Sequence, residues 1–470
     1  MTSNLELNKL TDKILNEDLE ECLESAVWLG RLLWHNNVGE YSLVDFETKL
    51  IDKYQCVVSC SLLDEVKNDK LLFVASECYL SGGHTRLMER LADGIDIQSD
   101  LLIIRPTSPD IISRLSEYFS SVYQVESQLG IVDKLQGIIS RLCKYDRIIL
   151  NIHPDDILTT IACGILKRLR KEHTVFYINH ADHAFNYGAS IADFWFQISA
   201  FGNHVDQHRN LTGKKSFLGI PLEISTFSNE NVTITNNNFI TAGSSVKYKP
   251  QNGYSIFPLL NAIMKSNPLS CLIVIGPDII RDYWWWKIKL KYPTRIRVHK
   301  RLPFDKYLLL TKQASAYIDS HPIPGGTAFV EQYLSGMRCV GLISPFQGYT
   351  PVELLKVKNT NQAVHGEWKK PEKLDSLVEL IHGKENVINR FKDTLFEGKV
   401  FENLCERHLP WSGDISYNLL QRFNSISSDF PLDNEVTKYA LRKARFNAKL
   451  LYLIKRCVRQ LSVYIKPGKR

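Results

Sequence analysis

Two short apolar runs, each followed by paired glycines and a helical pattern, constrain the fold of this chain more than any other feature. The first unit, residues 71–93, contains the turn Gly82-Gly83-His84-Thr85, and the second, residues 314–343, contains Gly325-Gly326-Thr327. A strand, a glycine turn and a helix start present free N–H groups that bind anions. Open α/β sheets bind ligands at the carboxyl ends of their strands, so the two units predict two domains facing across a cleft.

The length of 470 residues also favours two domains over one core. We expect five segments in chain order: a helical N-terminal extension of the first domain at 1–69, the rest of the first domain at 70–225, a polar linker at 226–238, a second domain at 239–410 and a helical basic tail at 411–470.

Apolar runs alternate with helical segments through both domains, which is typical of parallel sheets. The runs expected to be strands are Leu71–Ala75, Leu101–Ile104, Arg147–Ile152, Val175–Ile178, Phe239–Ala242, Cys271–Ile275, Ile296–His299, Ala316–Asp319 and Cys339–Ile343. We therefore predict an α/β fold of two Rossmann-like parallel-sheet domains.

The composition is that of a soluble globular protein, with 44% hydrophobic and 23% charged residues. The N-terminus lacks the basic and apolar regions of a secretory signal, and no apolar run is long enough to span a bilayer. The ten cysteines include no CxxC pair, which favours reduced thiols over disulfides or a zinc site. We therefore expect a cytoplasmic protein.

The tail carries most of the positive charge of the chain. Residues 436–470 contain eleven Lys or Arg and no acid, while the whole chain has a net charge of +7. Apolar residues recur in the tail at helical spacing, at Leu450, Ile454, Cys457, Leu461 and Ile465. Such a helix can lie on an anionic membrane surface, or it can pack on the body with a solvated charged face. No nucleic-acid partner is expected, because no aromatic–basic motif accompanies the charge.

Histidines and an aspartate follow the predicted strands of the first domain. His84 comes after two glycines, where a neutral imidazole can take a proton from a hydroxyl; a loop-packing histidine is the alternative. His180, Asp182 and His183 follow another strand, and can serve in the active cleft, bind a metal or only shape a loop. Their spacing does not match the usual zinc patterns, so no metal is expected. His153 lies in a third such turn.

In the second domain, small and basic residues follow the strands in a pattern that suits a diphosphate. The candidates are Gly243, Ser244, Lys247, Lys249, His321, Gly325, Gly326, Thr327 and Glu331. Glu331 lies about one helical turn beyond Thr327, where a carboxylate can accept hydrogen bonds from both hydroxyls of a ribose; an acid favoured by the helix dipole is the alternative.

These two loops resemble those of glycosyltransferases with the GT-B fold. In that family a glycine-rich turn meets the donor phosphates and a glutamate holds the ribose, which the resemblance assigns to Gly325, Gly326, Thr327 and Glu331. A histidine in the first loop of inverting members deprotonates the acceptor, which assigns that role to His84, with Asp182 as second choice and His183 beside it. The acceptor would then contact Gly82, Gly83, Thr85, Arg86, His153 and His180. The pattern of the whole chain, including the segments 179–193 and 241–250, also looks like that of bacterial cell-surface polysaccharide transferases, such as those of lipopolysaccharide, O-antigen or capsule.

The resemblance has one departure. Many retaining members have two glutamates separated by seven residues, but the position that corresponds to the first is Ile323 here. The resemblance implies metal-independent transfer from a UDP-sugar, with CMP-, GDP- and dTDP-sugars left open, to a hydroxyl of a glycan or lipid-linked acceptor. A nucleotide-sugar 2-epimerase of the same fold, and a degenerate transferase acting as a membrane-associated scaffold, are the alternatives.

Overall fold

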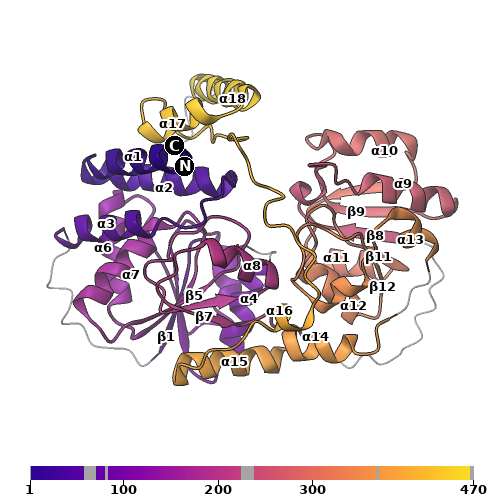
Figure 1. Cartoon of the computed structure of the whole chain (residues 1–470), viewed down its shortest axis with the longest axis horizontal. Helices are drawn as coiled ribbons and strands as arrows, with labels where there is room; N and C mark the ends of the chain where they lie inside the picture. The colour runs from indigo at the N-terminus through magenta and orange to yellow at the C-terminus, as the bar shows by residue number, and fades with distance from the viewer. Residues whose placement is uncertain (1, 58–69, 80–82, 224–237, 367–369, 466–470) are drawn as a thin grey trace.

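The chain folds into two α/β domains, each built on a parallel sheet, in the computed structural model shown in Figure 1. The structure describes residues 2–57, 70–79, 83–223, 238–366 and 370–465. The predicted fold class, with helical extensions at both ends, is confirmed. The predicted linker at 226–238 lies outside the described residues except for Asn238, and the segment bounds stay predictions.

The first sheet has seven strands in the order β3-β2-β1-β4-β5-β6-β7, and every pairing is parallel. The strands are β1 (Leu71–Ala75), β2 (Ser99–Ile103), β3 (Ser121–Gln124), β4 (Arg147–Asn151), β5 (Thr174–Ile178), β6 (Phe194–Gln197) and β7 (Lys214–Phe217). The prediction of only four strands here was wrong, because β3, β6 and β7 were missed. All three are four residues long, and β3 and β7 lie at the edges, where polar residues interrupt the apolar pattern.

Two hydrophobic clusters cover the two faces of this sheet. Leu72 and Val74 of β1 join the cluster with α2, α3, α6 and α7, whereas Phe73 joins the cluster with α4. All five residues of β1 are buried, as expected for a central parallel strand with helices on both faces. The helices of this domain are α1 (Thr2–Leu15), α2 (Leu19–His35), α3 (Val44–Gln55), α4 (Gly83–Asp93), α5 (Pro109–Leu115), α6 (Ile131–Leu142), α7 (Ile157–Leu169) and α8 (Ala200–Val205), with the 3₁₀ turn η2 (Asp206–His208).

The second sheet has five parallel strands in the order β10-β9-β8-β11-β12. All five predicted strands are present, as β8 (Phe239–Ala242), β9 (Leu272–Gly276), β10 (Ile296–Lys300), β11 (Ala316–Ile318) and β12 (Arg338–Val340). The helices of this domain are α9 (Phe257–Ser266), α10 (Trp286–Lys291), α11 (Phe304–Thr311), α12 (Thr327–Leu334), α13 (Thr360–His365) and α14 (Leu374–His382), with the 3₁₀ turns η3 (Ser245–Tyr248), η4 (Tyr283–Trp285) and η5 (Pro351–Leu355).

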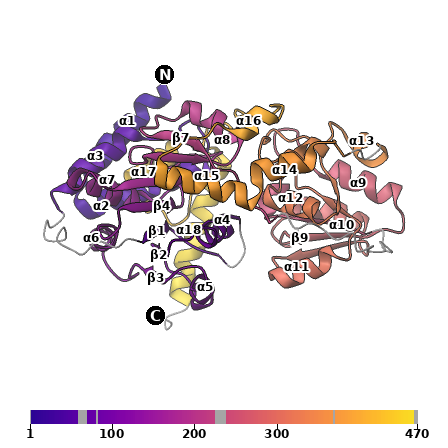
Figure 2. The same ribbon diagram turned by 90° about the horizontal axis from the view of Figure 1, so that it is seen from below.

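After α14 the chain returns to the first domain. Figure 2 shows α14 and α15 (Lys384–Glu397) running one after the other from the second domain across to the first. Val387, Phe391 and Leu395 of α15 are buried in the same cluster as α4. His382, at the joint, is fully buried; its Nε2 hydrogen-bonds the Tyr349 carbonyl and its Nδ1 accepts from the N–H of Ile220. The packing of α15 on the first domain and the hydrogen bonds of His382 thus hold the two domains together, in addition to the covalent chain.

The tail packs on the first domain near the N-terminal helices (Figure 1). The tail contains α17 (Glu435–Lys443) and α18 (Phe446–Ile465), whereas α16 (Leu404–His408) precedes it and contacts α8 and α14. Val436, Tyr439 and Ala440 of α17 are buried in the core cluster that includes α1 and α2. Among the described residues, no helix combines the length and the apolar character that crossing a bilayer requires.

Candidate active site

The two glycine turns predicted from opposite parts of the sequence face each other between the domains. α4 begins at Gly83 and α12 begins at Thr327. A methyl group added at Gly83 would lie 3.6 Å from the Thr327 hydroxyl oxygen. Arg90 of α4 donates to the Glu331 carboxylate of α12 at 2.9 Å, and Arg86 lies 3.6 Å from it. Two helix N-termini, each a site of partial positive charge, therefore meet here. Gly82 lies outside the described residues.

His84 is held so that one ring nitrogen can accept a proton. Its Nε2 lies 3.0 Å from the carbonyl oxygen of Glu77, which can only accept, so Nε2 carries the hydrogen and Nδ1 has the lone pair. The ring stacks on His180, with 5.3 Å between the centroids. Burial lowers the pKa of His84 and lowers the pKa of His180 further. Both imidazoles are therefore neutral near pH 7, and His84 has the form that a general base requires.

His153 lies at the end of the neighbouring strand β4 with a carboxylate behind its ring. Its Nδ1 contacts Asp155, which is buried and bonded to Arg105 and, at 3.0 Å, to Arg31. Burial alone would raise the pKa of Asp155, but the hydrogen bond from His153 and the charge of Arg105 outweigh it and hold that pKa well below its ordinary value. The permanently charged Asp155 fixes the orientation of the His153 ring, which makes His153 a second imidazole able to bind or deprotonate a hydroxyl.

Asp182 is a cross-domain contact in this structure. It is buried, and its carboxylate accepts from the hydroxyls of Ser199 and, at 2.9 Å, of Tyr349 in the second domain. His183 is half exposed, with its Nδ1 3.7 Å from the same carboxylate. Because hydroxyls occupy both oxygens of Asp182, the geometry favours His84 over Asp182 as the proton acceptor.

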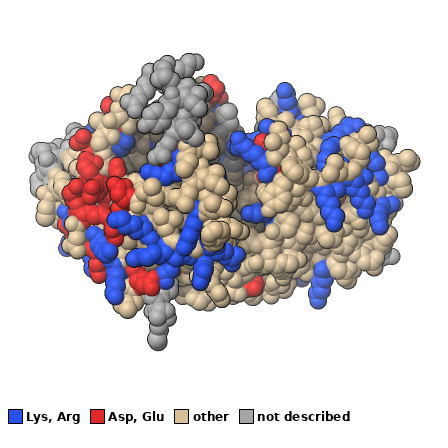
Figure 3. Space-filling model, turned by 90° about the horizontal axis from the view of Figure 1, so that it is seen from above, with Lys and Arg blue, Asp and Glu red and all other residues tan. Residues whose placement is uncertain are grey.

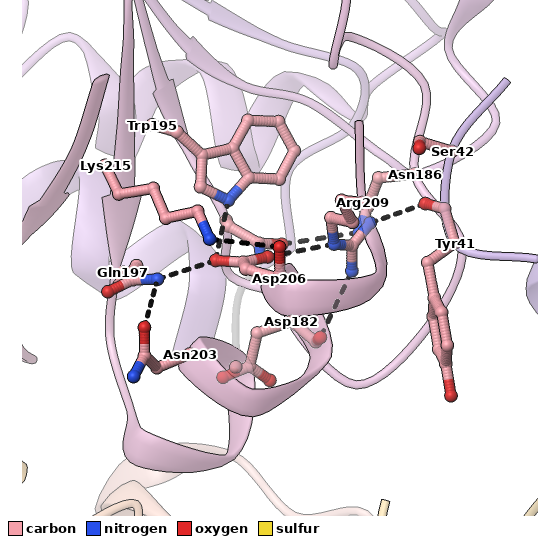
Figure 4. A network of polar contacts seen from close by, with 12 residues as sticks. Tyr41, Ser42, Asp182, Asn186, Trp195, Gln197, Asn203, Asp206, Arg209 and Lys215 are labelled. Atoms are coloured by element: carbon pink, nitrogen blue, oxygen red, sulfur yellow. Dashed lines mark hydrogen bonds and ion pairs between the residues drawn. The ribbon is translucent and has the colours of Figure 1, made fainter. Parts of the chain in front are cut away.

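A buried ion pair holds the loop that carries these residues, as Figure 4 shows. Arg209 is bonded to Asp206 at 2.9 Å and donates to the backbone carbonyls of Asp182 at 3.1 Å and Ala184 at 2.6 Å. Asp206 also accepts from the indole of Trp195 at 3.2 Å. Asp182, Asp206 and Arg209 are each at most 5% exposed, so the loop from His180 to His183 is fixed in place by charge-assisted hydrogen bonds.

The glycine turn of the second domain is organised by a buried carboxylate. Oδ1 of Asp319 accepts from the N–H groups of Ser320 at 2.9 Å and Gly325 at 2.7 Å, and Oδ2 lies 2.8 Å from the Lys356 ammonium. Lys247 donates to the carbonyl of Pro324 at 2.9 Å. Burial lowers the pKa of Lys247. Two lysines therefore place positive charge under the turn that begins α12.

The other donor-site candidates are placed differently. His321 is only 4% exposed and its Nδ1 has no hydrogen-bond partner; burial lowers the pKa of His321 to about 4. Gly243 and Ser244 follow β8 and precede η3, the turn that carries Lys247. Lys249 is exposed, and its ammonium lies 5.9 Å from the centre of the Trp284 ring. Lys249 thus points to an aromatic side chain, whereas Lys247 points to the turn.

No family model matches this chain, and no curated protein matches it. Solved structures do match. A variant of the O-GlcNAc transferase of Thermobaculum terrenum superposes with a TM-score of 0.50 at 10% identity, over 82% of this chain and 79% of its own. The sucrose-phosphate synthase of Thermosynechococcus elongatus also gives 0.50, at 12% identity, over 70% of this chain and 100% of its own. The fold is GT-B. At such identities the likeness shows the fold alone.

Within the GT-B fold, the structure brings Gly83 to Thr327, Arg86 to Glu331 and His84 to His180, and it adds partners that the sequence did not reveal. Asp319, Lys356, Asp155, Arg105 and Tyr349 were not predicted. Each pairs with a residue distant in the chain or lies outside any motif, and a single sequence shows no such pairing. A signal existed for Asp319, the carboxylate that ends the predicted strand before the glycine turn, and for Asp155, which lies in the polar turn of His153.

Gly325→Ala is expected to lower the free energy of unfolding by about 1–3 kcal/mol, the usual cost of overpacking. The added methyl would lie 2.6 Å from Oδ1 of Asp319, which Lys356 and two N–H groups prevent from moving aside. Thermal unfolding measures the change. Gly137→Ala is the control, because a methyl there meets nothing within 4 Å and lies in helix α6, so it should leave stability unchanged or raised. An unchanged melting temperature for Gly325→Ala would contradict the inference that Asp319 holds this turn rigidly.

Proposed function

We propose that this protein is a glycosyltransferase that moves a sugar from a nucleotide-sugar donor to a hydroxyl of a glycan or lipid-linked acceptor. The observation that carries the proposal is the meeting of the two helix starts at Gly83 and Thr327, with the neutral His84 beside them. We further propose a role in bacterial surface polysaccharide synthesis at the cytoplasmic face of an anionic membrane, which residues 436–470 contact.

The proposed reaction uses only groups of this chain. The donor diphosphate rests on the N–H groups at the start of α12, and the charge of Lys247 and Lys356 stabilises the leaving group without a metal ion. Nδ1 of His84 takes the proton of the acceptor hydroxyl. The acceptor oxygen then bonds to the anomeric carbon as the bond from that carbon to the phosphate oxygen breaks, and the nucleotide diphosphate departs. Among the described residues, no group of three or more His, Cys, Asp or Glu is arranged to hold a metal ion.

The donor is proposed to be a UDP-sugar, with GDP-, CMP- and dTDP-sugars as the other choices. A thermal-shift screen against these four classes tests the proposal, because a ligand that binds only the folded protein raises its melting temperature. Stabilisation by one class identifies the nucleotide. Interconversion of the sugar by the protein without any acceptor would instead indicate an epimerase and overturn the proposal.

Glu331→Ala is expected to weaken binding of the donor tenfold or more, about the value of one charge-assisted hydrogen bond to a ribose hydroxyl. Titration calorimetry with the nucleotide found in the screen measures it. Arg90 keeps a second partner, the carbonyl of Pro221 at 2.8 Å, so α4 stays anchored without the carboxylate. Glu372→Ala removes an exposed acid of the second domain and should leave affinity unchanged. Equal affinity of Glu331→Ala and the wild type would mean that the ribose lies elsewhere.

A further inference from the structure

The last helix presents an apolar stripe that no part of the described chain covers. Among residues 446–459, the part of α18 whose burial is described, only Ala448 and Tyr452 are buried against the body. The exposed apolar side chains follow one another at helical spacing, as Phe446 at 75%, Leu450 at 46%, Leu453 at 45%, Ile454 at 50% and Val458 at 60% exposure. Scattered exposed apolar residues are normal on soluble proteins, but a continuous stripe marks a surface that meets a partner.

The second domain has a matching surface on η4, α10 and the loop that precedes them. Its exposed side chains are Ile280 at 76%, Tyr283 at 65%, Trp286 at 50% and Leu290 at 79% exposure. Trp and Tyr with one polar end are the residues enriched where membrane meets water. In Figure 1, α10 and α18 lie along the same side of the molecule, one on each domain. We name the residues of these two patches the apolar rim.

Basic residues accompany both parts of the rim. Lys449 and Lys455 lie on α18, and no acid follows Glu435 to the end of the chain. Arg281, Lys287 and Lys291 accompany the other patch, where the only acid from residue 280 to 291, Asp282, is buried. Figure 3, viewed from this side, shows Lys and Arg on the surface of both domains, and a cluster of Asp and Glu confined to the outer edge of the first domain. The charge around the rim therefore complements an anionic surface.

We propose that the apolar rim is a docking surface for a bilayer of anionic phospholipid. The side chains of the stripe on α18, together with Tyr283 and Trp286, enter the headgroup region, and the lysines contact lipid phosphates. A bilayer is flat and meets both domains at once, which accounts for two separate patches on one side. The inference rests on and deepens the membrane contact proposed for residues 436–470, since it adds the patch on the second domain and names the side chains that enter the lipid. It does not depend on glycosyl transfer, because lipid binding needs neither donor nor acceptor. It would place the reacting groups between the domains close to a lipid-linked acceptor.

The test is sedimentation of the full chain with vesicles. We expect binding to vesicles that contain about one third phosphatidylglycerol, weaker binding at high salt, and little binding to pure phosphatidylcholine. Lys449→Gln with Lys455→Gln should weaken binding about 30-fold, from about 1 kcal/mol for each lysine. Leu450→Glu with Ile454→Glu, and separately Tyr283→Ser with Trp286→Ser, should each weaken it tenfold or more.

Leu380→Glu is the matched control, because Leu380 is 42% exposed on α14, on the opposite side of the molecule in Figure 1. It should bind vesicles like the wild type. The substituted residues are exposed, except for the partly buried Lys449, so thermal melting should confirm that each variant folds. Equal vesicle binding by all variants, no preference for anionic lipid, or a change of oligomeric state in the α18 variant would overturn the proposal. No nucleotide sugar is present in this assay, so failure of the glycosyltransferase proposal would leave its result unchanged.

Discussion

His84→Asn should lower the turnover number by about 10²-fold or more while changing donor affinity little. The imidazole is the general base in the proposed reaction, and an amide cannot take up a proton at any working pH. Asn is smaller than His but polar, so it suits a half-buried position whose neighbours include a backbone carbonyl. Steady-state turnover with donor and acceptor, together with calorimetric titration of the donor, separates the two effects.

The pH profile distinguishes loss of a base from loss of a loop contact. A base works in its neutral form, and burial lowers the pKa of His84 below the ordinary 6.5. The wild-type rate should therefore be constant near pH 7 and should decrease only as the pH falls toward this lowered pKa. In His84→Asn the decrease of the rate at acid pH should disappear, because the activity that depends on the imidazole is lost. If the variant keeps the same acidic limb at a reduced rate, His84 is not the base.

The control for His84→Asn is His365→Asn. His365 is an exposed histidine of α13 in the second domain, outside the proposed site, so its replacement should leave turnover unchanged. Unaltered turnover of His84→Asn itself would remove His84 from the role of base. Loss of donor binding in that variant would show instead that the first glycine turn supports the donor side.

The fold was predictable where burial on both faces forces an uninterrupted apolar sequence. β1 in the first sheet and β8 and β9 in the second were predicted with bounds within one residue of the structure for this reason. β3 and β7 lie at the edges of their sheet, and their polar residues leave no such pattern. The return of α15 to the first domain was not predicted either, since a helical period shows that a face is buried but not which domain buries it.

The positions of the two glycine turns in the candidate site could be predicted from backbone chemistry, but the side-chain pairs around them could not. Paired glycines before a helix indicate a close approach of the backbone, and this signal located both turns. Arg90 and Glu331 are separated by 241 positions, and Tyr349 and Asp182 by 167, so nothing local connects them. The same limit applies to the tail: the spacing of Leu450 and Ile454 predicted an apolar stripe, and only the structure shows that this stripe faces outward while α17 packs on the body.

Lys356→Met should lower the free energy of unfolding of the second domain by about 3–5 kcal/mol, the cost of leaving one buried charge without its partner. The side chains of Lys356 and Asp319 are each 1% exposed and lie 2.8 Å apart. Burial alone would lower the pKa of Lys356, but the charges of Asp319 and then Glu353 outweigh it and raise that pKa, so the lysine is charged in the folded protein. Without it, the Asp319 carboxylate keeps its N–H donors but loses its counterion.

The destabilisation by Lys356→Met is expected to be confined to the second domain, so a local measurement can detect it. Asp319 accepts from Ser320 and Gly325, so hydrogen exchange in peptides covering residues 316–342 should accelerate, while exchange in β1 and β4 of the first domain should not change. Lys358→Met, two residues away at an exposed position, should alter stability by no more than about 0.5 kcal/mol. Combining Lys356→Met with Asp319→Asn removes both charges and should recover much of the loss. A double variant as unstable as the sum of its parts would mean that packing, and not charge pairing, holds the donor turn.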